Sequence, residues 1–169
     1  MAKPNVKGAL FERMVAKKIH AAAGPQYKKE KCFRTPRSGG HHAQGYGDVQ
    51  VSKKLRRVFP FVVECKHWKD WSVDKLFKDG AQLANFLAQA SEGAVRAKKR
   101  YNLTLFPLLV VRGNNTPILC VFPKALLERD GNSKWSGFKA PLPRVMLHGW
   151  VACLFDSFLQ RWYKFSCGQ

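Results

Sequence analysis

Two strand-like segments, 48–51 and 58–66, constrain the fold more than any other part of the sequence. Both are rich in apolar residues, and the basic segment 52–57 separates them. This order predicts an antiparallel hairpin. If its turn centres near Arg56, the side chains divide cleanly between two faces, because successive strand residues point in opposite directions. One face is then wholly apolar, and it carries Val49, Val51, Phe61, Val63 and Cys65.

The other face of the predicted hairpin carries charge. In the same register Asp48 lies directly opposite Glu64, and Lys66 lies two residues further along that face. Directly opposed strand residues have Cβ atoms ~4.5–5.5 Å apart, so the two carboxylates repel each other unless a cation lies between them. Mg²⁺ prefers such oxygen ligands, and Lys66 could hold a water or neutralise charge on a phosphate. The pattern indicates metal-assisted phosphodiester hydrolysis; a solvated face with a cross-strand ion pair is the alternative.

Helical periodicity is found on both sides of this hairpin. Residues 6–23 place their apolar side chains on one stripe, and Glu12 lies at the edge of that stripe, neither fully solvated nor fully buried. Residues 73–99 also have helical spacing, although Gly80 weakens this prediction and Gly93 is a candidate break in the helix.

The remaining segments complete a mixed α/β domain. The sequence predicts a short strand at 31–36, a glycine-rich loop at 37–47, a second hairpin from 106–111 and 118–122, a short helix at 124–129, a Gly/Ser/Pro-rich stretch at 131–143 and an amphipathic segment at 148–165. The order helix, hairpin, helix, hairpin, helix is that of an α/β fold. We find no repeat or linker, so residues 1–169 are expected to form a single domain.

The last part of this domain, residues 131–169, is expected to be an extension that packs on the core or forms a dimer interface. Within it, a broad apolar stripe with helical spacing contains Trp150, Val151, Leu154, Phe155, Phe158, Leu159 and Trp162. A core helix that covers the sheet is the first interpretation. A homodimer interface is the alternative, because aromatic residues are enriched at the centres of interfaces.

Positive charge dominates the composition. Lys and Arg number 30 against 11 Asp and Glu, which gives a formal net charge of +19. Such a surplus repels itself on a compact body and usually serves to bind a polyanion. Four basic clusters, at 28–31, 53–57, 66–69 and 96–100, favour a surface that contacts nucleic-acid phosphates and not bases. An anionic membrane or a heparin-like polymer is the less favoured partner, and no small-molecule substrate is expected.

The compartment follows from what the sequence lacks. It has neither a signal-peptide pattern nor the ~20 consecutive apolar residues of a membrane-spanning helix. Its five cysteines are scattered, odd in number and without a C-x-x-C pair, which argues against a disulfide framework or a zinc site. We expect a soluble, cytoplasmic protein with reduced thiols. His41 and His42 have no Cys or carboxylate at ligand spacing in their loop, so phosphate contact or solvation is favoured over metal ligation.

Three motifs together resemble a known nuclease pattern. Glu12 on the first helix, then Gly47-Asp48, then Glu64-Cys65-Lys66 resemble the signature of the PD-(D/E)xK nucleases, with Gly47 in place of the motif's proline. Within that superfamily, residues 7–12 followed by 37–40 resemble the archaeal-type Holliday junction resolvases and their viral relatives.

This resemblance, which covers about half of the chain, implies a restriction-endonuclease-like fold. Such a fold has a central mixed β-sheet of about four or five strands flanked by α-helices. The resemblance implies that Glu12, Asp48 and Glu64 hold one or two Mg²⁺ ions, with Mn²⁺ as a substitute. Lys66 is then the residue that assists the attacking water, while Cys65 is expected to be a small buried hydrophobe.

The resemblance also implies roles outside the carboxylates. Ser38, in the glycine-rich loop, helps to position phosphate, and Gln82 lies on the following helix beside the active site. The implied substrate is a four-way DNA junction that a homodimer cuts symmetrically. DNA contacts are expected from Lys7, Arg37, Lys53, Lys54, Arg56, Arg57, His67 and Lys69.

Two other functions stay open at this point. The first is a nuclease of the same fold that acts on ordinary duplex, mismatched or flapped DNA. The second is a basic DNA-binding or packaging protein that keeps a nuclease-like shell without turnover. The presence of Glu12, Asp48, Glu64 and Lys66 argues against such a shell, because an inactive descendant often loses a ligand.

Overall fold

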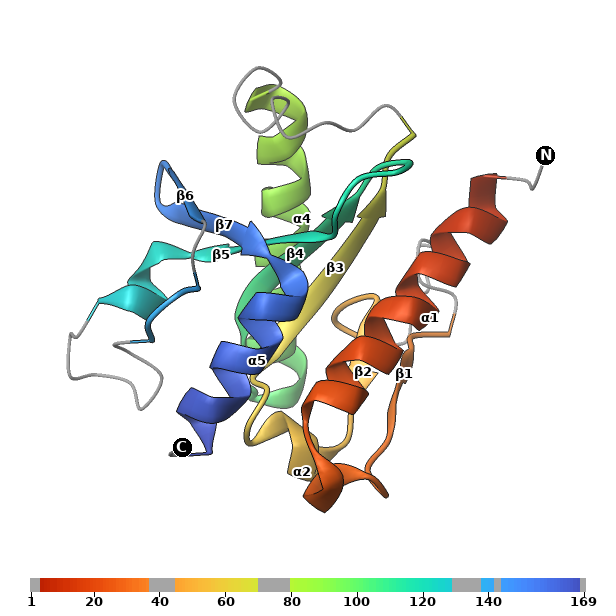
Figure 1. Cartoon of the computed structure of the whole chain (residues 1–169), viewed down its shortest axis with the longest axis vertical. Coiled ribbons are helices and arrows are strands. Elements are labelled where there is room, and N and C mark those ends of the chain that lie inside the picture. Colours follow the sequence, from red (N-terminus) through yellow and green to blue (C-terminus); the bar gives the residue numbers. More distant parts are fainter. Residues whose placement is uncertain (1–3, 37–44, 70–79, 129–137, 142–143, 168–169) are drawn as a thin grey trace.

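A seven-stranded sheet with strand order β1-β2-β3-β4-β5-β7-β6 forms the centre of the molecule (Figure 1). The computed structural model describes residues 4–36, 45–69, 80–128, 138–141 and 144–167. The strands are β1 (Cys32–Arg34), β2 (Val49–Val51), β3 (Phe61–His67), β4 (Phe106–Arg112), β5 (Leu119–Pro123), β6 (Arg144–Leu147) and β7 (Trp150–Leu154). The central strands β3 and β4 are parallel, and the other neighbouring pairs are antiparallel. The predicted mixed α/β fold is confirmed, but the sheet is larger than the four or five strands expected.

Helices cover both faces of the sheet. The described helices are α1 (Pro4–Ala22), α2 (Lys53–Arg56), α4 (Gly80–Tyr101) and α5 (Phe155–Ser166), with 3-10 turns η1 (Pro25–Tyr27) and η2 (Lys124–Leu127). The helices α1 and α5 share the larger hydrophobic cluster with one face of the sheet, and α4 packs on the other face. None of the helices in these described ranges is long and apolar enough to cross a membrane.

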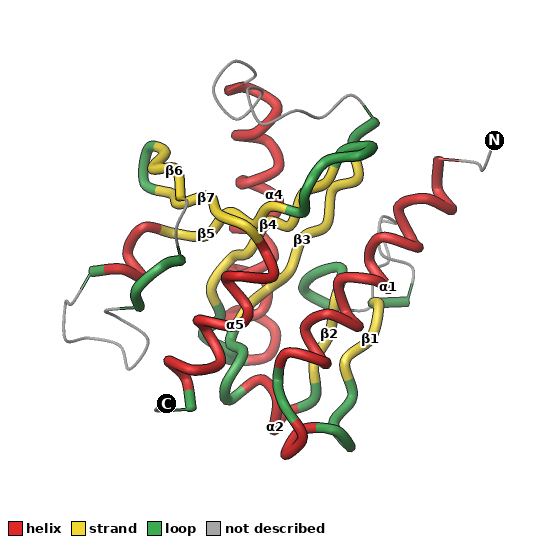
Figure 2. Tube along the Cα trace, viewed as in Figure 1, coloured by secondary structure: helices red, strands yellow, loops and turns green. Residues whose placement is uncertain are grey.

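The register between β2 and β3 is the one that the sequence predicts. Val49 pairs with Val63, so the position of Asp48 is opposite Glu64. The connection is more than the predicted hairpin turn near Arg56, because a helical turn, α2, lies within it (Figure 2). Leu55 in this connection is completely buried. An apolar anchor in the middle of the basic segment therefore draws the chain inward, where a simple hairpin turn would leave it in solvent.

The helix α4 runs unbroken through Gly93, which corrects the expectation of a break there. A Cβ atom at Gly93 would lie 2.5 Å from the Tyr46 carbonyl oxygen and 2.8 Å from Val62 Cγ1. Both distances are shorter than real Cβ contacts, so only glycine allows the helix to approach the sheet this closely. The predicted helix at 73–99 begins at Gly80 in the described residues, and its first part lies outside them.

The helical spacing of apolar residues in segment 148–165 suggested a single helix, but the structure has a strand followed by a helix there. Its first part is the strand β7, which pairs with β5 on one side and with the unpredicted strand β6 on the other. Gly149 allows the turn between β6 and β7, because its φ of 72° lies in the left-handed region that other residues avoid. Val151 and Ala152 are both buried, on opposite faces of the sheet. A strand buried on both faces is continuously apolar and cannot be distinguished from a helix by periodicity.

The aromatic residues of α5 lie in the core of the single chain. Trp162 packs edge-on against Phe61 with ring centroids 4.6 Å apart, and its indole nitrogen donates to the Val58 carbonyl oxygen at 2.7 Å. Phe155, Phe158, Leu159 and Trp162 are at most 2% exposed. These buried side chains stabilise the fold of the single chain, while a homodimer stays a prediction.

Candidate active site

The predicted acidic site lies at the edge of β3, where pairing with β2 ends. Asp48 precedes β2, and its backbone N–H donates to the Val63 carbonyl oxygen at 2.7 Å. One carboxylate oxygen of Asp48 accepts a hydrogen bond from the backbone N–H of Cys65 at 2.8 Å. The Asp48 side chain thus takes the place of a strand partner beside β3. This bond fixes the carboxylate next to Glu64.

The helix α1 brings Glu12 to the same edge. Phe11, the residue before Glu12, packs edge-on against His67 at the end of β3, with ring centroids 5.9 Å apart. Glu12 accepts a hydrogen bond from Arg34 Nε at 2.6 Å, and its side chain is only 12% exposed. Arg34 ends β1, and the sequence analysis did not select it because its partner lies far away in the chain.

Lys66 is held between an acid and an aromatic ring. Its ammonium nitrogen lies 2.8 Å from Glu64 Oε1 and 5.3 Å from the centroid of the Phe86 ring on α4. Glu64 and Lys66 are 17% and 25% exposed. The pair is therefore partly shielded from water, where charge interactions are stronger than at an open surface.

The electrostatic environment marks Asp48 as the most perturbed acid of the site. Burial is the main cause, and together with the neighbouring charge of Glu64 and the weaker effect of Glu12 it raises the pKa of Asp48 to about 7. The hydrogen bond from Cys65 and the charge of Lys66 act in the opposite direction. Two neighbouring carboxylates therefore act on the partly buried Asp48, which is an arrangement that a cation would stabilise.

The residues fit a divalent cation in chemistry but do not form a preassembled cage. Among the described residues, no group of three or more His, Cys, Asp or Glu side chains converges closely enough to hold an ion. The reason is visible in the ion pairs, since Arg34 holds Glu12 and Lys66 holds Glu64. The donors are all oxygen atoms, which suits Mg²⁺ or Mn²⁺, and ligation would replace these two ion pairs.

A second cationic group lies next to the acids, and it includes a residue that the sequence analysis missed. Burial, followed by the charges of Arg112 and Lys7, lowers the pKa of His67. Arg112 ends β4 directly beside His67. Its Nε is buried without a hydrogen-bond partner among the described residues, and its Nη1 contacts only the sulfur of Met14, at 3.7 Å. A charged residue at the end of an otherwise apolar strand was the available signal.

Other predicted residues lie at different distances from this group. Gln82 is exposed on the first turns of α4, four residues before Phe86, so it shares a helix face with the ring that contacts Lys66. Lys69 is exposed just after β3. Arg37, Ser38, His41 and His42 lie outside the described residues.

The basic segment around α2 lies near the start of β3, while the acids lie near its end (Figure 1). Two of its cationic side chains interact with other residues of the chain. Arg56 lies over the Tyr46 ring at 5.6 Å and donates to the Val51 carbonyl oxygen, and Lys54 lies 3.8 Å from Glu30. Lys53, Arg56 and Arg57 also line a pocket of about 290 Å³. This cluster is therefore separate from the acidic site.

A mixed α/β sheet with Asp48 and Glu64-x-Lys66 at the edge of a central strand, faced by helical Glu12, defines a nuclease of the PD-(D/E)xK class. Comparison with family models is more specific. The model described as "Phage putative PDDEXK endonuclease" matches residues 3–160, and the chain belongs to this family. Comparisons with curated proteins and with solved structures found no match. The family supports a nuclease and a phage origin. It does not by itself support the more specific resemblance to the archaeal-type Holliday junction resolvases.

Proposed function

We propose that this protein is a Mg²⁺-dependent endodeoxyribonuclease that hydrolyses DNA phosphodiesters at the edge of β3. The observation that carries the proposal is the raised pKa of Asp48, which burial, Glu64 and Glu12 produce together, with Lys66 in contact with Glu64. Such a perturbed carboxylate beside specific charge partners is typical of a catalytic site. The net charge of +19 supports a polyanionic substrate.

Glu12, Asp48 and Glu64 are the residues that would hold one or two Mg²⁺ ions, with Mn²⁺ as a substitute. The bound ion supplies a Lewis acid and lowers the pKa of a coordinated water to the range where it is a nucleophile. Arg34 and Lys66 would give up their ion pairs with Glu12 and Glu64 if those acids held the ion. Lys66, freed in this way but still stacked near Phe86, is then placed to hold the attacking water or to neutralise charge on the phosphate.

The groups near the end of β3 bind the substrate in this proposal. Lys7 and Arg112 are positively charged and lie close enough to His67, at the end of β3, to lower the pKa of this imidazole. Arg112, beside His67 at the end of β4, is proposed to attract a phosphate oxygen through its positive charge. Ser38 and Gln82 are proposed, from the resemblance, to position phosphate and to support the site from α4.

The preferred substrate that we propose is the four-way DNA junction. Support comes from the resemblance of residues 7–12 and 37–40 to junction resolvases, and from clusters of cations suited to backbone phosphates. Such contacts recognise shape and not sequence. Paired symmetric incisions require two active sites related by the two-fold symmetry of the junction, so a homodimer is part of the proposal.

A cleavage assay with three substrates tests both levels of this proposal. End-labelled four-way junction, matched linear duplex and single strand are incubated with Mg²⁺, with Mn²⁺ and with EDTA. The wild-type protein is compared with Glu64→Ala and with Glu128→Ala, whose glutamate lies on the surface and pairs with Lys124 among the described residues. DNA binding is measured separately in EDTA, so that loss of cleavage can be distinguished from loss of affinity.

We expect paired nicks in the junction with either metal, none with EDTA, and none with Glu64→Ala although this variant still binds DNA. The Glu128→Ala control should cut like wild type. Metal-dependent cutting of all substrates would keep the nuclease site and remove the junction preference. Tight binding without cutting under any metal would refute the proposal and leave a DNA-binding protein.

A further inference from the structure

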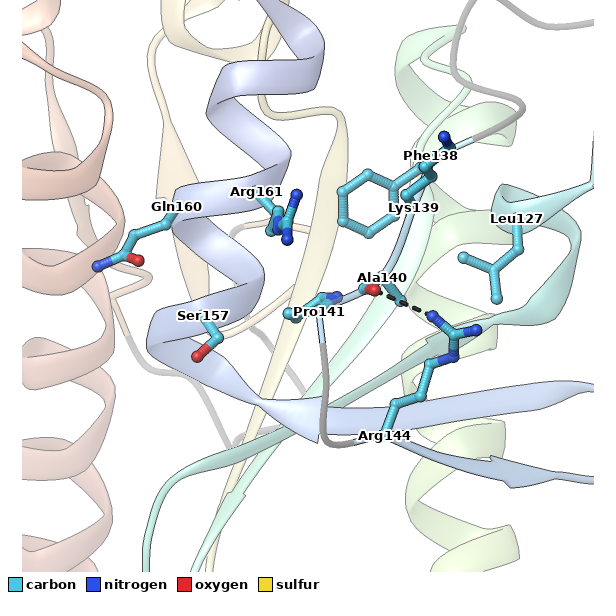
Figure 3. Close-up of a pocket in the computed structure, with 9 residues that line it drawn as sticks. All are labelled: Leu127, Phe138, Lys139, Ala140, Pro141, Arg144, Ser157, Gln160 and Arg161. Carbon is cyan, nitrogen blue, oxygen red and sulfur yellow. Dashed lines mark hydrogen bonds between the residues drawn. The ribbon is translucent and has the colours of Figure 1, made fainter.

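A pocket of about 690 Å³ lies beside α5 and shares no described residue with the acidic site (Figure 3). Its walls come from α5, from residues 138–141 and from the start of β6. This volume lies within the range of ~300–1,000 Å³ that is usual for ligand pockets. The part of the molecule that forms it is the C-terminal third, for which the sequence analysis proposed only packing or dimerisation.

The lining of this pocket is strongly basic. Lys139, Arg144 and Arg161 are exposed, and the described lining contains no acidic residue. None of the three is paired with a carboxylate in the part of the chain that the structure describes. Arg144 is held in place by a hydrogen bond from its Nη1 to the Ala140 carbonyl oxygen at 3.0 Å. Three cations with no internal counterion around one cavity favour an anionic ligand.

The aromatic and neutral polar residues of the pocket lining indicate which part of a nucleic acid would bind. Phe138 is the one aromatic residue in the described lining, and it is only 1% exposed because its ring packs against Phe122 and Trp162. It therefore offers no free face on which a base could stack. Ser157 and Gln160 of α5 also line the pocket, and their neutral polar groups suit phosphate oxygens. The pocket thus matches the phosphates of a nucleic acid better than its bases.

We propose that the pocket lined by Lys139, Arg144 and Arg161 binds the backbone phosphates of a DNA segment other than the one held at the acidic site. The inference rests on the proposed function in taking DNA as the polyanion. It goes further by giving the C-terminal third a role in holding a second segment of the substrate. Because the contacts are to phosphates, this binding is independent of base sequence.

The salt dependence of DNA binding tests this proposal directly. The double variant Arg144→Gln with Arg161→Gln is compared with a matched control, Lys17→Gln with Lys164→Gln, which removes two exposed cations outside the pocket. Binding to a junction and to a duplex of about 30 base pairs is measured in EDTA over a range of salt concentrations. The slope of log K against log salt is negative, and each lost phosphate contact reduces its magnitude by ~0.9. Thermal melting of both variants confirms that they fold.

We expect the pocket variant to lower the slope by ~1.8, while the control changes it by less than half as much. An unchanged slope for the pocket variant on both DNAs would overturn the proposal. A separate titration with adenosine monophosphate and with inorganic phosphate tests free ligands. Binding of these that the pocket variant abolishes, with an unchanged DNA slope, would also overturn it in favour of a free nucleotide or phosphate. All binding is measured without cleavage, so a failure of the proposed nuclease activity cannot produce these outcomes.

Discussion

At the edge of β3, Lys66 lies 2.8 Å from Glu64 and both side chains are largely shielded from water. Arg161 on α5 is instead exposed and has no carboxylate partner among the described residues. The first region contains charges of both signs that burial forces to interact, as the raised pKa of Asp48 shows. The second contains only positive charge in open solvent. Shielded charges of opposite sign suit catalysis, whereas exposed charges of one sign suit the binding of an oppositely charged ligand. Their substitution should therefore change different measured quantities.

The largest expected effect comes from Lys66→Ala. Removing a cation that stabilises charge developing on the phosphate typically lowers kcat by about 10²–10³-fold. Low salt should not restore the activity of this variant, because the substitution affects the chemical step and not DNA binding. Arg161→Ala should instead lower DNA affinity, and low salt should largely restore it. Single-turnover cleavage and DNA binding at two salt concentrations separate the two variants. A loss for Lys66→Ala that low salt repairs would erase the difference between the regions.

The packing behind the acidic site should be far less tolerant than the protein surface. Gly93→Ala places a Cβ atom 2.5 Å from the Tyr46 carbonyl oxygen, two residues before Asp48. Overpacking of this kind costs typically 1–3 kcal/mol in the free energy of unfolding. Gly80→Ala is the matched control, because nothing lies within 4 Å of a Cβ at that position. Chemical denaturation measures both changes. Equal stability of the two variants would contradict the close approach of α4 to the Tyr46 segment.

The sequence predicts features that depend on local patterns better than features that depend on contacts between distant residues. Val49, Val51 and Val63 alternate along short strands, so local pattern alone is enough for the register that places Asp48 opposite Glu64. Arg34 and Arg112 were missed because Glu12 and His67, their neighbours, lie far away in the sequence. Tertiary contacts of this kind leave little local signal; for Arg112 it was only a charged residue at the end of an otherwise apolar strand.

The C-terminal region shows the limit of periodicity. Trp150–Leu154 is buried on both faces between two strands, so its apolar run matched a helical stripe as well as a strand. The helix α5 itself was predicted correctly because its buried and exposed positions do alternate with helical spacing. The pocket beside it could not be predicted, since it depends on Leu127, residues 138–141 and Arg144 lying next to α5.

The next expected effect is a pH dependence of metal binding at the acidic site. Burial, Glu64 and Glu12 raise the pKa of Asp48 from 3.8 to about 7, so the folded chain holds a proton that the unfolded chain releases. The stability contributed by this group therefore falls as pH rises from 3.8 to about 7 and is constant above that range. Mg²⁺ must displace the proton, so its apparent affinity should rise by about tenfold per pH unit up to that point.

Thermal melting with and without Mg²⁺ at several pH values measures this dependence. The stabilisation by Mg²⁺ should be larger at neutral pH than in mild acid, and Glu128→Gln should behave like wild type because its glutamate lies outside the site. Equal stabilisation by Mg²⁺ at all pH values would show that Asp48 is not a ligand that loses a proton.

The smallest expected effect is that of Arg112→Ala, which tests whether the acidic site has its own phosphate contact. Removing one such contact should lower the slope of log K against log salt by ~0.9. Burial, Arg112 and Lys7 lower the pKa of His67, so the variant should also raise this pKa, as an NMR titration of the imidazole can measure. Arg100→Ala, an exposed residue near the end of α4, is the control for the loss of one cation. A raised pKa of His67 with an unchanged salt slope would place Arg112 beside His67 but not on the DNA. The pocket beside α5 would then be the better-supported region for phosphate binding.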